Sequence, residues 1–126
     1  MSLEIALVAL GGGIGALVRY LTALITARLW GETFPWGTLA VNLAGCFLIG
    51  VIYAFGVEAG AVGPRARLFV MTGLLGGFTT FSTFSLETST LLMQGAGWEA
   101  SLNLVGNVVG GLMLFMAGLI IGRILT

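Results

Sequence analysis

The sequence predicts an all-α integral membrane protein of four transmembrane helices, the third of which is broken near its middle. Of the 126 residues, 58% are hydrophobic and only 8% are charged, too few charges to cover a soluble domain. Four stretches with few or no charges are long enough to cross about 30 Å of hydrocarbon, which takes about 20 helical residues. We therefore expect a single membrane domain over residues 1–126, with spans at about 3–27, 37–57, 67–93 and 99–122.

The composition excludes several kinds of site and partner. The chain has no histidine and one cysteine, Cys46, inside the second expected span. A disulfide within one chain and a metal site built from histidine and cysteine are therefore excluded. No basic run indicates nucleic-acid binding, and no nucleotide-binding motif or catalytic triad indicates an enzyme. The composition instead indicates that the chain is surrounded by membrane lipid.

The first span combines a face of small residues with one charge. Gly11, Gly12, Gly13 and Gly15 allow another helix to pack closely. Arg19 interrupts the apolar sequence. It is either an arginine whose long side chain reaches the membrane surface or a cation in a water-filled vestibule.

Asparagine residues lie inside the second and fourth spans. An amide at membrane depth is costly unless it has a partner. Thr38 and Asn42 lie four residues apart, as do Asn103 and Asn107, so each pair shares a helix face. These amides either form hydrogen bonds that hold the helices together or line a polar pathway.

The third span contains a stretch, residues 73–87, whose composition is unusual for a lipid-facing helix. Gly73, Gly76 and Gly77 weaken the helix where the bilayer midplane is expected, each by about 1 kcal/mol relative to alanine. A break there frees backbone carbonyl groups, which is tolerated in lipid only where protein or a cavity receives them. Freed carbonyls can coordinate a cation.

Hydroxyl and aromatic residues follow these glycines. We expect the hydroxyl groups to form a polar track; they belong to Thr79, Thr80, Ser82, Thr83 and Ser85. Phe78, Phe81 and Phe84 recur every three residues, as in a packed ridge. Alternatively, their positive ring edges, together with hydroxyl and amide donors, could replace the water shell of a small anion. A lining without lysine or arginine would let such an anion leave again.

The arginines give only a weak topological bias. Four spans put both termini and the second loop on one side, which carries Arg65, Arg67 and Arg123. The other side carries Arg28, and Arg19 as well if it reaches that surface. Because the positive-inside rule discriminates so weakly here, we expect insertion in both orientations and an antiparallel homodimer with a two-fold axis in the membrane plane.

Three motifs resemble the Fluc/CrcB family of fluoride channels. Residues 76–87, GGFTTFSTFSLE, look like the family's third-helix signature, and residues 37–45, GTLAVNLAG, look like its second-helix motif. Residues 11–19 are similar to the family's glycine-rich first helix, which ends in arginine. The resemblance covers essentially the whole chain, and the two long motifs are specific.

The resemblance implies a dual-topology, antiparallel homodimer with two fluoride pores and one structural sodium ion at the dimer interface. Phe81 and Phe84 correspond to pore phenylalanines that come from opposite subunits, and Asn42 to the pore asparagine. The main-chain carbonyls of Gly76 and Thr79 correspond to the sodium ligands. The remaining residues expected along the fluoride pathway are Thr38, Thr83 and Asn107, while Gly111 stands where the family often has a polar residue.

Arg19 and Glu87 are expected at similar depths. Arg19 lies about 16 residues after the start of the first span and Glu87 about 19 residues after Leu68, in helices that run in the same direction. The two residues either share a vestibule or interact directly, or they are independent charges near the membrane surface.

Two transport functions fit these observations. The resemblance implies a channel that exports fluoride passively across the cell (inner) membrane and relieves fluoride toxicity. The alternative is a proton-coupled cation exporter similar to the small multidrug transporters, which needs a membrane-embedded carboxylate early in the first helix. Glu4 lies at the very start of that span and is poorly placed, so Glu87 would have to substitute. A purely structural bundle explains the glycines but not the clustered polar and aromatic groups.

Overall fold

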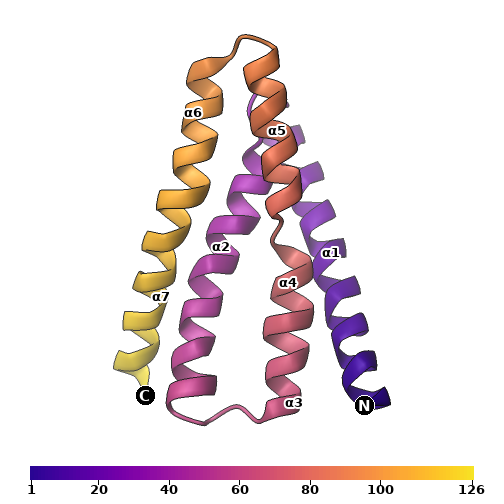
Figure 1. Cartoon of the computed structure of the whole chain (residues 1–126), viewed down its shortest axis with the longest axis vertical. Helices are drawn as coiled ribbons and strands as arrows, with labels where there is room; N and C mark the ends of the chain where they lie inside the picture. Colours follow the sequence, from indigo (N-terminus) through magenta and orange to yellow (C-terminus); the bar gives the residue numbers. More distant parts are fainter.

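The protein forms four long helical rods, and the computed structural model describes all 126 residues (Figure 1). Span 1 is α1 (Ser2–Trp30), and span 2 (Trp36–Glu58) contains α2 (Trp36–Ile52) and the π-helical η1 (Tyr53–Glu58). Span 3 (Pro64–Met93) contains α3 (Pro64–Arg67), η2 (Leu68–Leu75), α4 (Gly76–Phe78) and α5 (Phe81–Met93). Span 4 (Gly97–Leu125) contains α6 (Gly97–Val105), η3 (Gly106–Gly110) and α7 (Gly111–Leu125). All four are long and apolar enough to cross a membrane, so the prediction of an all-α protein with four spans is confirmed.

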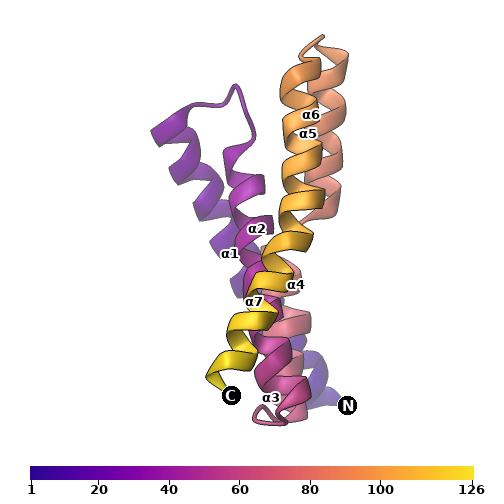
Figure 2. The same cartoon turned by 90° about the vertical axis from the view of Figure 1, so that its left-hand side faces the viewer.

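In the view of Figure 2, the rods lie together at one end, which we call the closed end, and diverge at the other, which we call the open end. Both chain termini and the loop between span 2 and span 3 lie at the closed end (Figures 1 and 2). At the open end, the last turns of α1 and the following loop turn to one side, and the α5–α6 hairpin turns to the other (Figure 2). A cavity of about 460 Å³ lies between these two arms.

Glycines let span 1 and span 3 pack backbone to backbone. A Cβ added at Gly15 would lie 2.7 Å from the backbone nitrogen of Phe78, and one at Gly11 would lie 3.1 Å from the Cα atom of Gly73. A Cβ at Gly77 would likewise lie 3.0 Å from backbone atoms of span 1. Such close approach of small residues provides the van der Waals contact that holds membrane helices together.

Span 2 packs on span 4 in the same manner. A Cβ added at Gly50 would lie 2.9 Å from the backbone nitrogen of Leu119. At the closed end, Arg123 Nε donates a hydrogen bond to Glu58 Oε2 at 2.8 Å. The fold is therefore built from two glycine-packed helix pairs, span 1 with span 3 and span 2 with span 4.

The break in span 3 lies a few residues later than the glycines suggest. Gly73, Gly76 and Gly77 are all helical, and the extended residues are Thr79 (φ −84°, ψ 160°) and Thr80 (φ −153°, ψ 124°). The expected position was wrong because Gly73 and Gly77 allow close packing on span 1 and do not interrupt the helix. The chain leaves the helix where a side chain of span 2 offers other partners.

Candidate functional site

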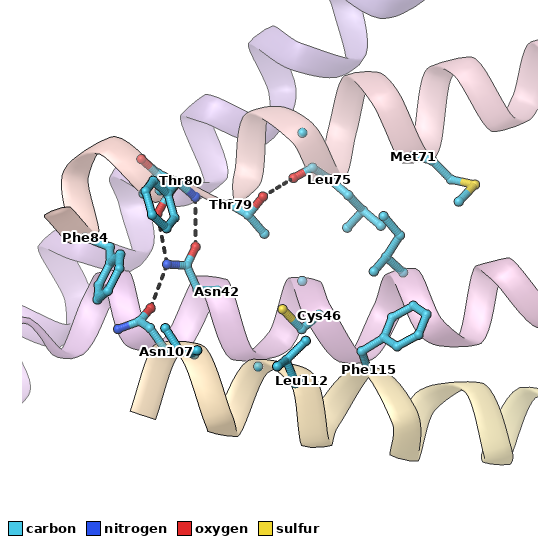
Figure 3. A pocket seen from close by; sticks show the side chains of 16 residues that line it. Asn42, Cys46, Met71, Leu75, Thr79, Thr80, Phe84, Asn107, Leu112 and Phe115 are labelled. Carbon is cyan, nitrogen blue, oxygen red and sulfur yellow. Dashed lines mark hydrogen bonds between the residues drawn. The ribbon is translucent and has the colours of Figure 1, made fainter. Parts of the chain in front are cut away.

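One side chain of span 2 holds the break in span 3. Asn42 Oδ1 accepts a hydrogen bond from the Thr80 N–H at 2.8 Å, and Asn42 Nδ2 donates to the Thr80 carbonyl oxygen at 2.9 Å (Figure 3). The amide thus replaces both partners that the backbone of Thr80 loses where the helix is interrupted. No bulk water can satisfy these groups inside a membrane, so a side chain has to do so.

Thr80 also begins the next helix. Its hydroxyl oxygen accepts a hydrogen bond from the Thr83 N–H at 3.2 Å, which makes it the N-cap of α5. Its hydroxyl donates to Thr83 Oγ1 at 3.0 Å, so the proton of the Thr83 hydroxyl is left for another acceptor. On the other side of the break, the Thr79 N–H still bonds the Leu75 carbonyl at 3.0 Å.

Asn42 is also one end of a row of amides, which we call the amide ladder: Asn42, Asn107 and Asn103. Asn42 Nδ2 donates to Asn107 Oδ1 at 2.7 Å, and Asn107 Nδ2 donates to Asn103 Oδ1 at 2.9 Å and to the Asn103 carbonyl at 2.8 Å. Asn103 Nδ2 donates in turn to Thr88 Oγ1 at 2.9 Å. Both N–H groups of Asn42 are therefore used within the chain. These amides hold helices together, which is one of the two roles that the sequence left open.

A cavity of about 530 Å³ lies beside the ladder, between spans 2, 3 and 4. Asn42, Asn107 and Phe84 lie at one end of it, and Met71 and Phe115 lie at the other (Figure 3). The lining residues from the region of the break are Gly76, Thr79, Thr80 and Phe81. None of the residues that line this cavity carries a charge.

Phe81 and Phe84 meet edge to face beside the break. Their ring centroids are 5.4 Å apart and the rings are inclined by 63°. Phe84 is only 5% exposed, whereas Phe81 is 77% exposed and extends from the chain at membrane depth. A ring edge carries partial positive charge, so this pair can offer weak positive potential without a formal cation.

The carbonyls of Gly76 and Thr79 fit a main-chain cation site. In an unbroken helix the Thr80 N–H would bond the Gly76 carbonyl, but here it is donated to Asn42. A Cβ added at Gly76 would meet only the Met71 carbonyl oxygen, at 3.8 Å, so this side of the helix is open. Both carbonyl-bearing residues line the same cavity. Carbonyl oxygens from broken helices suit a hard cation such as sodium.

Thr38 and Glu87 lie at a second cavity, of about 460 Å³, at the open end of the molecule. The Thr38 hydroxyl donates to Glu87 Oε1 at 2.7 Å, and Glu87 Oε2 is buried without a partner. Although Thr38 shares a helix face with Asn42, it does not line the first cavity. The structure thus separates Thr38 from most of the residues expected along the pathway.

Arg19 and Glu87 do not meet within the chain. Arg19 Nε donates to the Gly77 carbonyl at 3.1 Å, next to the break, and the two residues form no ion pair. The expectation of similar depths was wrong because the packing of Gly15 against Phe78 brings Arg19 beside Gly77, well before Glu87 in span 3. Arg19 therefore supplies a donor to one of the last carbonyls before the break.

Two members of this arrangement, Asn103 and Thr88, were not among the expected site residues. The four-residue spacing between Asn103 and Asn107 was the available signal in the sequence. Their link to Thr88 depends on how α5 and α6 fold back on one another, which residue spacing along one helix does not reveal.

The carboxylate that a small multidrug-type exporter needs is not embedded in span 1. Glu4 lies in the first turn of α1, half exposed, and its carboxylate is 3.3 Å from the amino terminus. It lies at the closed end, away from both cavities.

Comparisons with known proteins agree with the motifs. A family model described as "CrcB-like protein, Camphor Resistance (CrcB)" matches residues 6–119. The chain is 45% identical over 121 residues to the fluoride-specific ion channel FluC of Agrobacterium fabrum, an alignment that covers 96% of this chain and 97% of that protein. It is 52% identical over 109 residues to FluC of Shewanella loihica, covering 86% of each chain. It is 47% identical over 119 residues to FluC of Opitutus terrae, covering 93% and 87%.

Proposed function

We propose that this chain, which belongs to the CrcB family, is a fluoride-selective channel that exports fluoride passively across the cell (inner) membrane. The observation that supports this most strongly is the uncharged cavity at the break in span 3, where polar and aromatic groups meet at membrane depth. Fluoride enters cells as neutral HF and ionises inside, so a passive channel lets the anion leave down its electrochemical gradient.

The chemistry of the break suits a small, strongly hydrated anion. The edges of Phe81 and Phe84 and the free proton of the Thr83 hydroxyl can replace part of its water shell. No lysine or arginine lines the cavity, so the anion is not held too tightly to leave. Because both N–H groups of Asn42 are already used, we assign Asn42 the role of holding these groups in position.

The second subunit in this proposal is another copy of the chain in the opposite orientation. Asn42, Asn107 and the break would be costly if they faced lipid, so the cavity has to be covered by protein. The break lies close to the middle of the 30-residue span 3, so a two-fold axis in the membrane plane brings two breaks together. The exposed Phe81 then packs in the interface.

A sodium ion at the main-chain carbonyls of Gly76 and Thr79 would stabilise this dimer. A bound cation supplies positive charge to carbonyl oxygens that the break leaves without amide partners. Purification with a bulky organic cation in place of sodium is then expected to lower the dimer fraction. An unchanged dimer fraction would show that sodium does not stabilise the dimer.

The test is fluoride resistance in a bacterium whose own fluoride exporter has been deleted. Expression of this chain is expected to restore growth in mildly acidic fluoride medium, where HF entry is fastest. The same strain is also challenged with a toxic quaternary ammonium cation, which a small multidrug-type exporter would remove. Resistance to the cation without resistance to fluoride would overturn the channel proposal in favour of the exporter.

A further inference from the structure

Asn103 is a completely buried polar side chain, with 0% exposure, that lines neither cavity. We infer that Asn103 is a positioning residue that fixes the orientation of the amide ladder and thereby the geometry of the break at Thr80. This inference rests on the proposed function where it concerns fluoride flux, but not where it concerns the structure of the break.

The ladder has a direction, because each amide has one donor end and one acceptor end. Asn103 Oδ1 accepts a hydrogen bond from Asn107 Nδ2, and Asn103 Nδ2 donates to Thr88 Oγ1, a hydroxyl that can donate or accept and so does not itself set the direction. Asn107 Nδ2 is held by Asn103 Oδ1 together with the Asn103 carbonyl oxygen, so Asn107 presents its own oxygen to Asn42 Nδ2.

With Nδ2 of Asn42 fixed in this way, its oxygen faces the Thr80 N–H and the Thr80 peptide is bound at both of its polar groups. Reversal of any one amide would place two donors or two acceptors against each other. The ladder therefore transmits one orientation from α6 to the break.

Asn103 and Thr88 also join α6 to α5, so a loss of activity on substitution could reflect only a weaker helix pair. Thr88→Val provides the matched control. It removes the same hydrogen bond between α5 and α6 but leaves Asn103 Oδ1 as an acceptor for Asn107. Asn103→Leu, of similar size, removes both bonds of the Asn103 side chain.

The first measurement is fluoride efflux from vesicles, normalised to the amount of assembled protein. We expect Asn103→Leu to lower the efflux rate by about tenfold, which corresponds to about 1.4 kcal/mol, and Thr88→Val to lower it less. In an Asn107→Leu background, Asn103→Leu is expected to have no further effect, because its route to the break is already interrupted. Two results would contradict the inference: a further loss of efflux rate when Asn103→Leu is added to Asn107→Leu, or equal losses of rate for Asn103→Leu and Thr88→Val. Either would show that Asn103 only joins α6 to α5.

The second measurement is hydrogen–deuterium exchange of peptides that contain Thr80, which does not require fluoride conduction. Asn103→Leu is expected to accelerate exchange at this amide relative to the parent and to Thr88→Val. Exchange as slow as in the parent would overturn the inference. If the leucine variant does not assemble, Asn103→Ala takes its place in both measurements with the same expected results. A parent protein that conducts no fluoride would refute the proposed function while leaving the exchange measurement to decide the role of Asn103.

Discussion

At the scale of single residues, the asparagine amides inside the spans act mainly on the backbone and on each other. Asn42 uses its oxygen and both N–H groups within the chain: two bonds hold Thr80, and one joins Asn107. In the proposed channel, the groups that would meet an anion are then the aromatic edges and the hydroxyl of Thr83. This division assigns positioning to the asparagines and direct contact to the residues that follow the break.

Phe81 and Phe84 provide the residue-scale prediction. Replacing either with isoleucine removes a ring edge, so both variants are expected to lower fluoride efflux by about tenfold, the effect of about 1.4 kcal/mol. Only Phe84→Ile is expected to destabilise the individual subunit, by about 1 kcal/mol, because Phe84 is 5% exposed and Phe81 is 77% exposed.

Efflux and thermal unfolding of the same preparations check the phenylalanine prediction. Phe55→Ile is the matched control, since Phe55 lies in η1 and lines neither cavity. Normal efflux in both the Phe81 and the Phe84 variant would exclude the aromatic edges from the pathway.

At the scale of elements, the glycines and the threonines of span 3 have different tasks. Gly73 and Gly77 bring the helix against span 1, while Thr79 and Thr80 form the break. Arg19 of span 1 then bonds the Gly77 carbonyl, so the same packed surface also supports the end of the helix before the break.

The packing of span 1 on span 3 can be tested with two glycines of α1. A Cβ at Gly15 would lie 2.7 Å from a backbone atom of span 3, whereas one at Gly13 would have nothing within 4 Å. Gly15→Val is therefore expected to cost about 3 kcal/mol or more through overpacking. Gly13→Val is expected to change stability by less than about 1 kcal/mol. Unfolding in detergent, followed by circular dichroism, measures both, and equal stabilities would contradict the packing described here.

Sequence reasoning predicted the four spans and the existence of a break, because both depend on local composition. It misplaced the break, because a glycine can weaken a helix or let another helix approach, and only the neighbouring span decides between these roles. It also misjudged the depth of Arg19 relative to Glu87, since counting from the start of each span ignores how the helices pack. Asn103 was seen only as a neighbour of Asn107, because its partner Thr88 comes from another helix.

At the scale of the whole molecule, the chain by itself leaves its polar centre uncovered. The cavity of about 530 Å³, the 77% exposed Phe81 and the break near the middle of span 3 are all at the depth where lipid would otherwise lie. In our proposal, closure by a second, inverted copy would satisfy these groups and would also account for the weak arginine bias between the two sides. The fluoride pathway in our proposal is therefore a property of the dimer.

The proposed fluoride selectivity is tested by measuring fluoride and chloride efflux side by side from vesicles that contain the purified protein. A fluoride electrode and a chloride electrode follow release from identical preparations, with protein-free vesicles as the baseline. We expect fast fluoride release and chloride release close to the baseline, because Phe81 and Phe84 offer weak ring-edge contacts in an uncharged cavity and the Thr83 hydroxyl lies next to the break. Baseline fluoride release from a verified, folded dimer, or release of both anions at equal rates, would contradict the proposed selectivity.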